Sequence, residues 1–288
     1  MGTRASALAL AQARWVAELL PEESELVPIS TSGDRRGPVS DKSRWIAELE
    51  RALLEERIDI AVHSAKDVPA ELAEGLSLVA IPRRADARDA ICGAGGLSEL
   101  AQGATVGTSS LRRAAQLRAA REDLRVVEMR GNVDTRLRKL SEGAADALVL
   151  ACAGLERLGR FDEAGGVLEE LVPAAGQGAL AIEGRGGHVP AAVVEALDDP
   201  ETAASVHAER ELTRRLDASC NTPVGAHARP CGGATIELRA WVGLPDGSRW
   251  ISDSMRGASE GLGVAVAERM LAVGARELLE RAELEVGA

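Results

Sequence analysis

Short apolar runs alternate with stretches of helical periodicity through the first two thirds of the chain. The runs are rich in valine, leucine and isoleucine, which is typical of buried strands. Between them, a stretch such as Ser43–Arg57 places Leu49 and Leu53 at helical spacing. Because strands that alternate with helices pack in α/β layers, we expect largely parallel sheets. The expected strands are Ile58–Val62, Ser77–Ile81, Ala104–Gly107, Leu124–Val127 and Ala147–Leu150.

Two segments of unusual composition indicate where the first two thirds divide into lobes. Pro82–Asp89 is densely charged and predicts a hinge. Leu171–Ala179 is rich in glycine and proline and predicts a second crossing between the lobes. We therefore expect two lobes that the chain connects twice.

The last third of the chain predicts a separate α+β unit. One helix is expected from Pro200 to about Asp217, and another from about Glu260 to Leu284. Between them, the expected strands Thr235–Trp241 and Arg249–Ser252 flank Asp246-Gly247, a sequence typical of a hairpin turn.

Composition and charge argue against several classes of protein. The 288 residues carry 34 Lys and Arg against 45 Asp and Glu, and a formal charge of −11 disfavours nucleic acid and anionic membranes as partners. No apolar run approaches the roughly 18–20 residues that cross a bilayer, and no signal-peptide pattern opens the chain. The 4 cysteines are too few and too scattered for a disulfide framework, so we expect cytoplasmic thiols.

Positive charge collects in Thr105–Leu140, where arginines outnumber acidic residues. A solvated helix face is one interpretation of such a run. However, Arg112 and Arg113 follow one expected strand end and Arg130 follows another, each with a helix starting behind it. Helix N-termini at strand ends attract anions, and arginine binds carboxylates bidentately. The placement therefore predicts a small ligand with several carboxylates.

A candidate acid also follows a strand. Lys66 and Asp67 come shortly after Ile58–Val62. A Lys–Asp turn without chemistry is one interpretation; the other is a carboxylate that accepts a ligand N–H or stabilises a cation formed during reaction. His63 fits a structural role better. Ser6, at the start of an expected helix, is either a helix cap or part of an anion site.

The cysteines differ in their surroundings. Cys220 lies in a loop of turn residues, where a thiol is expected to be exposed and open to covalent modification. Cys220, His227 and Cys231 match no structural zinc pattern and lack a fourth ligand, so we expect no metal. Cys92 and Cys152 are expected to be buried.

Taken together, several segments resemble the porphobilinogen deaminase (hydroxymethylbilane synthase) family over nearly the whole chain. In chain order they are Thr-Arg-Ala-Ser-Ala-Leu-Ala-Leu, Asp-Ile-Ala-Val-His-Ser-Ala-Lys-Asp-Val-Pro, Val-Gly-Thr-Ser-Ser-Leu-Arg-Arg, Arg-Gly-Asn-Val-Asp-Thr-Arg-Leu, Ala-Gly-Leu-Glu-Arg-Leu-Gly, Gly-Gln-Gly-Ala and Cys-Asn-Thr-Pro-Val-Gly. The resemblance implies an α/β fold of three domains. The first two resemble the lobes of a periplasmic binding protein around a cleft, and the third is a small α+β domain. The implied domains are residues 1–83 with 178–197, residues 87–173 and residues 200–288.

The resemblance also implies a reaction. Members of the family are transferases that join four porphobilinogen molecules head to tail, lose ammonia each time and release linear hydroxymethylbilane for haem, chlorophyll and corrin biosynthesis. It implies a dipyrromethane cofactor bound to Cys220 through a thioether, with Asp67 as the catalytic carboxylate. The implied cofactor-binding residues are Ser6, Lys66, Ser109, Arg112 and Arg113; the implied substrate-binding residues are Arg4, Arg130, Arg136 and Arg157; the implied lid residues are Lys42 and Trp45.

The residues themselves agree with this reaction. Each pyrrole ring carries two carboxylates, so a growing chain needs many arginines. The main alternative is a non-enzymatic, two-lobed binding protein for a small polycarboxylate, which predicts no adduct on Cys220. We further expect a cytoplasmic monomer that binds porphobilinogen but neither nucleic acid nor membrane. Because few residues precede Arg4, we expect the first strand to be nearly absent.

Overall fold

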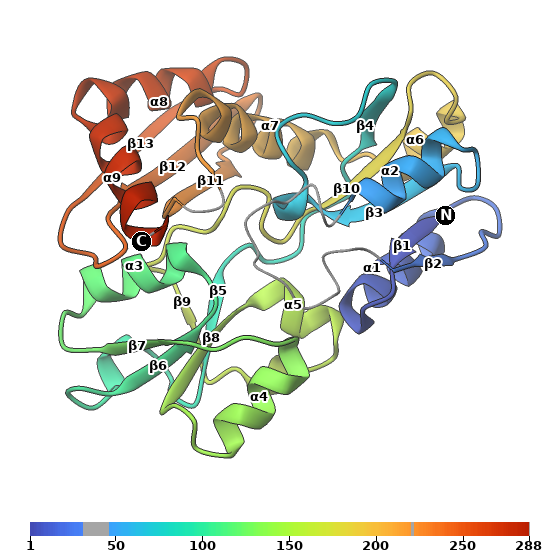
Figure 1. Cartoon of the computed structure of the whole chain (residues 1–288). Coiled ribbons are helices and arrows are strands. Elements are labelled where there is room, and N and C mark those ends of the chain that lie inside the picture. The colour runs from blue at the N-terminus through green and yellow to red at the C-terminus, as the bar shows by residue number, and fades with distance from the viewer. Residues whose placement is uncertain (31–45, 220–221, 288) are drawn as a thin grey trace.

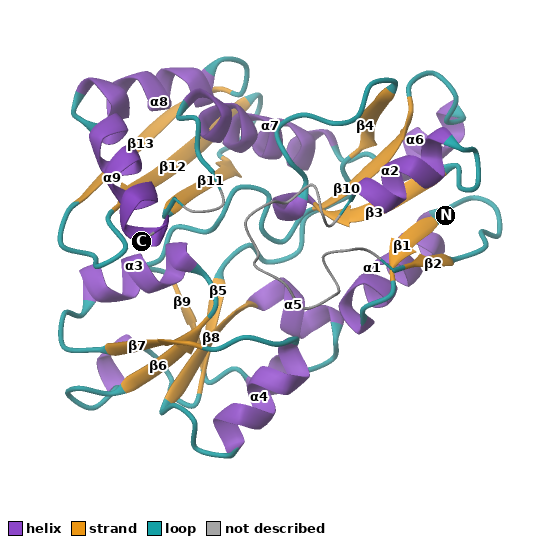
Figure 2. Cartoon of the chain, in the orientation of Figure 1, coloured by secondary structure: helices purple, strands orange, loops and turns teal. Residues whose placement is uncertain are grey.

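The computed structural model describes residues 1–30, 46–219 and 222–287. These residues form three sheets, each with its own helices (Figures 1 and 2). Two are lobes of similar construction, and the third is smaller and lies at the C-terminal end. This arrangement confirms the predicted α/β class with two lobes and a small third unit.

The first lobe is built from both ends of the first two thirds of the chain. Its strands are β1 (Gly2–Arg4), β2 (Val27–Ile29), β3 (Ile60–Ser64), β4 (Leu76–Ala80) and β10 (Leu180–Arg185), and its helices are α1 (Ala7–Leu19), α2 (Ala47–Leu54), η3 (Ala65–Asp67, a 3-10 turn) and α6 (Ala191–Leu197). The strands lie in the order β2-β1-β3-β10-β4. Val16 of α1 and Ile182 of β10 are both fully buried in the core of this lobe.

The second lobe comes from the middle of the chain. Its strands are β5 (Asp89–Cys92), β6 (Thr105–Thr108), β7 (Arg125–Glu128), β8 (Ala147–Ala151) and β9 (Gly166–Leu168), and its helices are η4 (Leu97–Glu99), α3 (Leu111–Ala120), α4 (Val133–Ser141), α5 (Cys152–Arg157) and η5 (Phe161–Glu163). The strands lie in the order β7-β6-β8-β5-β9. The three strands that sequence periodicity predicts in this lobe lie side by side at its centre and edge.

The expectation of largely parallel sheets is wrong, since both lobes are mixed. β1 pairs in parallel with β2 and β3, whereas β10 runs antiparallel to β3 and β4. Likewise β6 is parallel to β7 and β8, and β5 is antiparallel to β8 and β9. A parallel neighbour needs a crossover helix within the same lobe. β5 and β10 instead arrive from the other lobe, so they can enter in the opposite direction.

The first strand is short but present, although we expected it to be nearly absent. Its backbone continues the sheet, because the Val27 amide donates to the Met1 carbonyl at 2.9 Å. The terminal ammonium of Met1 donates to the Glu25 carbonyl at 2.8 Å, and the Met1 side chain is buried. These contacts hold a three-residue strand in place between β2 and β3.

The third unit is an antiparallel sheet covered by helices. It comprises α7 (Pro200–Arg215), β11 (Val224–Pro230), β12 (Thr235–Gly243), β13 (Trp250–Ala258), α8 (Leu262–Ala272) and α9 (Ala275–Gly287). The hairpin between β12 and β13 forms at Asp246-Gly247, as its sequence predicts. The single helix expected from about Glu260 to Leu284 is wrong. Gly274 has a φ of 100° and divides it into α8 and α9, because a left-handed residue ends a helix.

Two segments connect the lobes. Residues 81–88, the first crossing, join β4 to β5, and residues 169–179, the second crossing, join β9 to β10. Glu209 of α7 is fully buried and binds both crossings to the third unit. Its Oε1 lies 2.6 Å from Arg84 Nη1, and its carboxylate accepts the amides of Gly176 at 2.6 Å and Ala228 at 2.7 Å. This one carboxylate therefore contacts both crossings and strand β11 of the third unit.

Candidate active site

Lys66 and Asp67 lie where the first lobe meets the second crossing. Both belong to η3, which directly follows β3, and both side chains are half-buried. The Ala65 amide donates to the Ala179 carbonyl at 3.0 Å. Gly176 has a φ of 73°, and a Cβ on it would lie 2.9 Å from the Lys66 amide nitrogen. The crossing therefore packs directly on the turn that carries the candidate acid, which fixes its backbone.

The second lobe brings two predicted arginines to the same region. Arg157, at the end of α5, donates from Nη2 to the Gly178 carbonyl of the second crossing at 2.7 Å. Arg136 of α4 donates from Nη1 to Ser109 Oγ, just after β6, at 3.3 Å. We call Lys66, Arg136 and Arg157 the cationic cluster.

The charges of the cationic cluster are poorly compensated. Burial lowers the pKa of Lys66, and it lowers the pKa values of Arg136 and Arg157 to about 10. Within the described residues none of the three forms an ion pair with a carboxylate, and the buried Nε of Arg136 has no hydrogen-bond partner. Buried cations without counter-ions favour binding of an anion. Chemically, such a cluster can bind a ligand with several negative charges.

Arg112 and Arg113 are buried behind this cluster around a shared carboxylate. Asp89 accepts from Arg112 Nη2 at 2.8 Å and from Arg113 Nε at 2.9 Å. These two positive charges lower the pKa of Asp89 to about 2, despite its burial. Gln177 Nε2 also donates to Asp89, at 2.7 Å. Arg112 and Arg113 thus carry strong contacts within the protein, whichever ligand they also meet.

Sequence reasoning missed Asp89 and Gln177. The signal that could have found Asp89 was a carboxylate at the start of an apolar run, directly after the charged first crossing. Such a buried charge requires a partner, and the adjacent pair of arginines on α3 supplies it. Gln177 lies in the Gly-Gln-Gly-Ala segment that carries the resemblance, but that segment alone assigned it no role.

The remaining described site residues are more dispersed. Ser6 caps α1, because its Oγ accepts the Ala9 amide at 3.3 Å. Arg4 ends β1, two residues before that cap. Arg130 is exposed at the end of β7, and its Nε donates to Glu128 Oε1 at 2.6 Å. Helices α1 and α5 contact each other, which brings the first-lobe helix capped by Ser6 toward the second lobe.

Three predicted site residues lie outside the described residues: Cys220, Lys42 and Trp45. The residues on either side of Cys220 are placed by the third unit. Thr222 is buried, and its Oγ1 donates to the Ser219 carbonyl at 2.8 Å.

Several other polar residues lie apart from the cationic cluster. His63 is buried, with Nε2 2.8 Å from Glu183 Oε2 of the neighbouring strand β10. Cys92 and Cys152 are buried, which confirms that expectation, and Cys231 is exposed. In residues 1–30, 46–219 and 222–287, no cluster of histidine, cysteine and acidic side chains could hold a metal ion. Within the same ranges, no helix has the length and apolar character to span a membrane.

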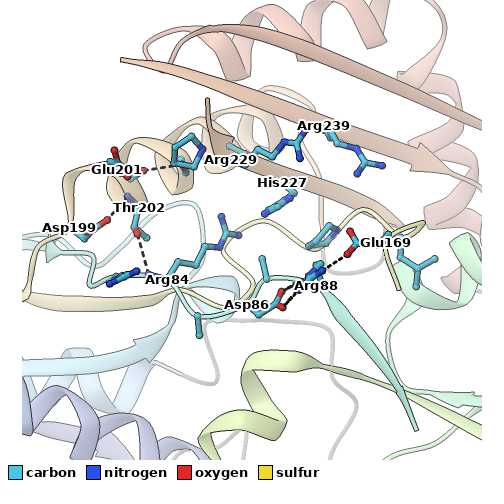
Figure 3. Close-up of a pocket in the computed structure, with 18 residues that line it drawn as sticks. Arg84, Asp86, Arg88, Glu169, Asp199, Glu201, Thr202, His227, Arg229 and Arg239 are labelled. Atoms are coloured by element: carbon cyan, nitrogen blue, oxygen red, sulfur yellow. Dashed lines mark hydrogen bonds and ion pairs between the residues drawn. The ribbon is translucent and has the colours of Figure 1, made fainter. Parts of the chain in front are cut away.

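A cavity of about 760 Å³ lies elsewhere, at the meeting point of both crossings with the third unit (Figure 3). Arg88 of the first crossing binds Asp86 and also Glu169 of the second crossing at its edge. Burial and the nearby positive charges of Arg84 and Arg239 lower the pKa of His227 in the wall to about 4. None of the predicted site residues lines this cavity.

Comparison with known proteins gives matches along nearly the whole chain. Residues 1–193 match the family model "Porphobilinogen deaminase, dipyromethane cofactor binding domain", and residues 203–272 match "Porphobilinogen deaminase, C-terminal domain". A porphobilinogen deaminase from Deinococcus deserti is 46% identical over 308 aligned residues, covering 98% of each chain. Another from Brevibacillus brevis is 44% identical and covers 97% of this chain and 96% of its own.

Similar solved structures include periplasmic proteins, at low sequence identity. An arginine-specific periplasmic binding protein of Salmonella typhimurium gives a TM-score of 0.39 and 14% identity, covering 70% of this chain and 94% of its own. The periplasmic VFT2 domain of Bordetella pertussis BvgS gives a TM-score of 0.37 and 16% identity, covering 66% of this chain and 75% of its own.

Proposed function

Because the chain belongs to the porphobilinogen deaminase family, we propose that Asp67 is its catalytic carboxylate and Cys220 the residue that holds its cofactor. The enzyme is a hydroxymethylbilane synthase, a transferase of tetrapyrrole biosynthesis with a dipyrromethane cofactor and porphobilinogen as substrate. The alternative of a non-enzymatic binding protein is not favoured, since the deaminase relatives match nearly the full length of the chain.

The observation that supports the proposed site is that Arg136 and Arg157 form no ion pair within the described residues, while Lys66 adjoins Asp67 in η3. Dipyrromethane carries acetate and propionate groups, so it fits a site whose buried cations lack counter-ions and whose Arg136 Nε has no partner. We propose that Lys66 and Ser109, with Ser6, hold cofactor carboxylates. Arg112 and Arg113 would share their donors between the cofactor and Asp89.

When bound, dipyrromethane supplies a free pyrrole carbon as the nucleophile. The proposed role of Asp67 concerns the cation that remains when porphobilinogen loses ammonia. A half-buried carboxylate stabilises positive pyrrole nitrogens through short-range charge and by accepting their N–H groups. Arg4, Arg130, Arg136 and Arg157 are proposed to bind the acetate and propionate groups of substrate and growing chain.

The proposal also covers the lid residues and the protein's location and partners. Lys42 and Trp45 are proposed to cover the site as a lid. We also propose that the enzyme works as a cytoplasmic monomer without nucleic-acid or membrane partners; its formal charge of −11 supports the latter, because anionic polymers and surfaces repel it.

The test combines intact mass with turnover. The purified protein is expected to exceed its polypeptide mass by one dipyrromethane, and C220A is expected to lack that increment. D67N, which preserves shape but removes charge, is expected to retain the increment and lose nearly all consumption of porphobilinogen. E71Q, an exposed carboxylate change four residues away, is the matched control and should be fully active. Near-normal turnover of D67N, or an unmodified wild-type mass, contradicts the proposal.

A further inference from the structure

Arg210 of α7 reaches the segment that follows the candidate acid. Its Nη1 donates to the Val68 carbonyl at 3.0 Å, and its Nη2 donates to the Pro69 carbonyl at 2.6 Å. Two consecutive carbonyls are therefore bound by one planar guanidinium, which fixes their relative orientation. Val68 is the residue directly after Asp67, so this contact sets the path of the chain as it leaves the acid.

The same face of α7 also makes an apolar contact with this segment. Val206, four residues before Arg210, is fully buried in one cluster with Val68 and Ala65. Residues four apart lie on the same face of a helix, so α7 contacts the segment through an apolar side chain and a charged one in adjacent turns. The opposite end of the turn is held as well, since the Ala65 amide binds the second crossing.

The partners of Arg210 are unusual for a buried cation. Burial lowers its pKa, with Arg214 as a further unfavourable charge, and within the described residues no carboxylate forms an ion pair with it. An arginine held only by carbonyls gives up hydration without a counter-charge. A neutral residue would pack there at a lower desolvation cost. What arginine adds is the pair of directed hydrogen bonds to the two carbonyls.

The location of α7 gives this contact a further consequence. The helix begins beside the first crossing and ends at Arg215, five residues before Cys220 (Figure 1). Glu209, next to Arg210, binds Arg84 and Gly176 of the two crossings. One helix thus joins the crossings, the segment after Asp67 and the start of the loop that carries the cofactor cysteine.

We infer that Arg210 is a positioning residue, which holds the Val68–Pro69 peptide so that Asp67 keeps a fixed place relative to the end of α7. This inference rests on the proposed role of Asp67. Arg210 does not touch the reacting atoms; it acts through the backbone. Displacement of a catalytic group by about 1 Å lowers turnover by up to about 100-fold.

Three variants of the holoenzyme test the inference. R210M keeps the length of the side chain but removes both donors, and R210K retains a cation that can reach one carbonyl. R215M is the matched control, because Arg215 lies on the same helix in an exposed pair with Glu268. We expect R210M to lower kcat by about 10- to 100-fold with KM changed less than about threefold, and R210K to restore part of the loss. R215M should match the wild type.

Amide hydrogen exchange separates positioning from a general loss of stability. In R210M the peptide covering residues 66–71 should exchange at least about tenfold faster, while strands β6 and β8 of the second lobe keep wild-type exchange. Unchanged exchange in residues 66–71, or faster exchange with normal kcat, overturns the inference. If R210M fails to fold, R210K decides: a folded R210K with wild-type exchange and kcat overturns it equally. An active D67N refutes the proposed role of Asp67. The exchange measurement on the Arg210 variants is independent of that result.

Discussion

At the residue scale, Asp89 is a buried charge that depends on several partners. Its carboxylate is fully buried and holds two arginines and Gln177 at the start of β5. The arrangement satisfies the charge of Asp89 but leaves Arg112 dependent on it, because the other partners of Arg112 are neutral oxygens of Val172 and Gln177. The network is consequently sensitive to loss of a single charge.

We expect D89N to destabilise the protein by about 3–5 kcal/mol, because it leaves two buried guanidinium groups without a counter-charge. Urea unfolding of the holoenzyme measures this loss. D86N is the control: Asp86 binds Arg88 at a half-exposed position, and its loss should cost less than about 1 kcal/mol. Equal effects of the two substitutions would show that burial of Asp89 is not what makes it important.

His227 gives the folded state a characteristic dependence on pH. Its pKa is lowered to about 4 in the folded protein, against about 6.5 in an unfolded chain. Between these values the unfolded chain binds a proton that the folded protein does not. Stability is therefore fully present above about pH 6.5 and falls as the pH drops toward 4.

Replacing His227 should remove that dependence. H227Q is expected to flatten the loss of stability between pH 6.5 and 4.5, where the wild type loses up to about 2 kcal/mol through this group. Thermal unfolding across this pH range measures the difference. H207Q, at an exposed histidine of α7, should leave the wild-type profile unchanged. A parallel profile for H227Q and wild type would mean that the proton is taken up elsewhere.

At the element scale, periodicity predicted the strands whose apolar residues are consecutive. The runs around Val62, Val106 and Val149 all form strands, displaced by at most a few residues. It missed β1, β2 and β9, which have three residues each and are therefore too short for a periodic signal. β5 and β10 were missed for a different reason: each follows a crossing, and its short apolar run does not show by itself that the chain re-enters a sheet there.

The turn of the β12–β13 hairpin was predicted correctly, but its sequence did not show that the turn contacts the second lobe. Gly247 has a φ of 76°, and a Cβ there would lie 2.6 Å from the Ala119 amide nitrogen of α3. Arg118 on the same helix donates from Nη1 to the Pro245 carbonyl at 2.7 Å. The turn is therefore docked against the second lobe, and glycine is required both for its conformation and for the close approach.

A pair of substitutions separates these two requirements. Gly187 has a similar φ of 74° but has nothing within 4 Å of an added Cβ. We expect G187A to cost about 1 kcal/mol from backbone strain alone, and G247A to cost about 1–3 kcal/mol more, because the turn must also move away from α3. Equilibrium unfolding measures both. Equal losses would mean that the hairpin does not depend on its contact with the second lobe.

At the scale of the whole molecule, positive charge is concentrated in residues 105–140, although the chain as a whole has a formal charge of −11. Sequence reasoning located most of this charge, since strand ends followed by helices are visible as patterns. It could not show which arginines already form ion pairs with carboxylates of the protein. Arg112 and Arg113 bind Asp89, and Arg130 binds Glu128, whereas Arg136 and Arg157 have only neutral partners among the described residues. That distinction depends on residues brought together by the fold.

The distinction predicts which arginine limits the growing chain. Arg136 is half-buried and uncompensated, so its charge is available to the carboxylates of a polyanion at short range and with little screening. Arg138, two residues later on α4, pairs with Glu142 at an exposed position. R136L should slow turnover by about 10-fold or more, through loss of a charged contact worth a few kcal/mol, and enzyme with fewer than four added porphobilinogen units should accumulate. R138L should behave as the wild type. Intact-mass spectra taken during turnover resolve these species, because each added pyrrole raises the mass by a fixed increment. A wild-type distribution in R136L would show that the lack of an ion-pair partner for an arginine does not identify the residue that holds the growing chain.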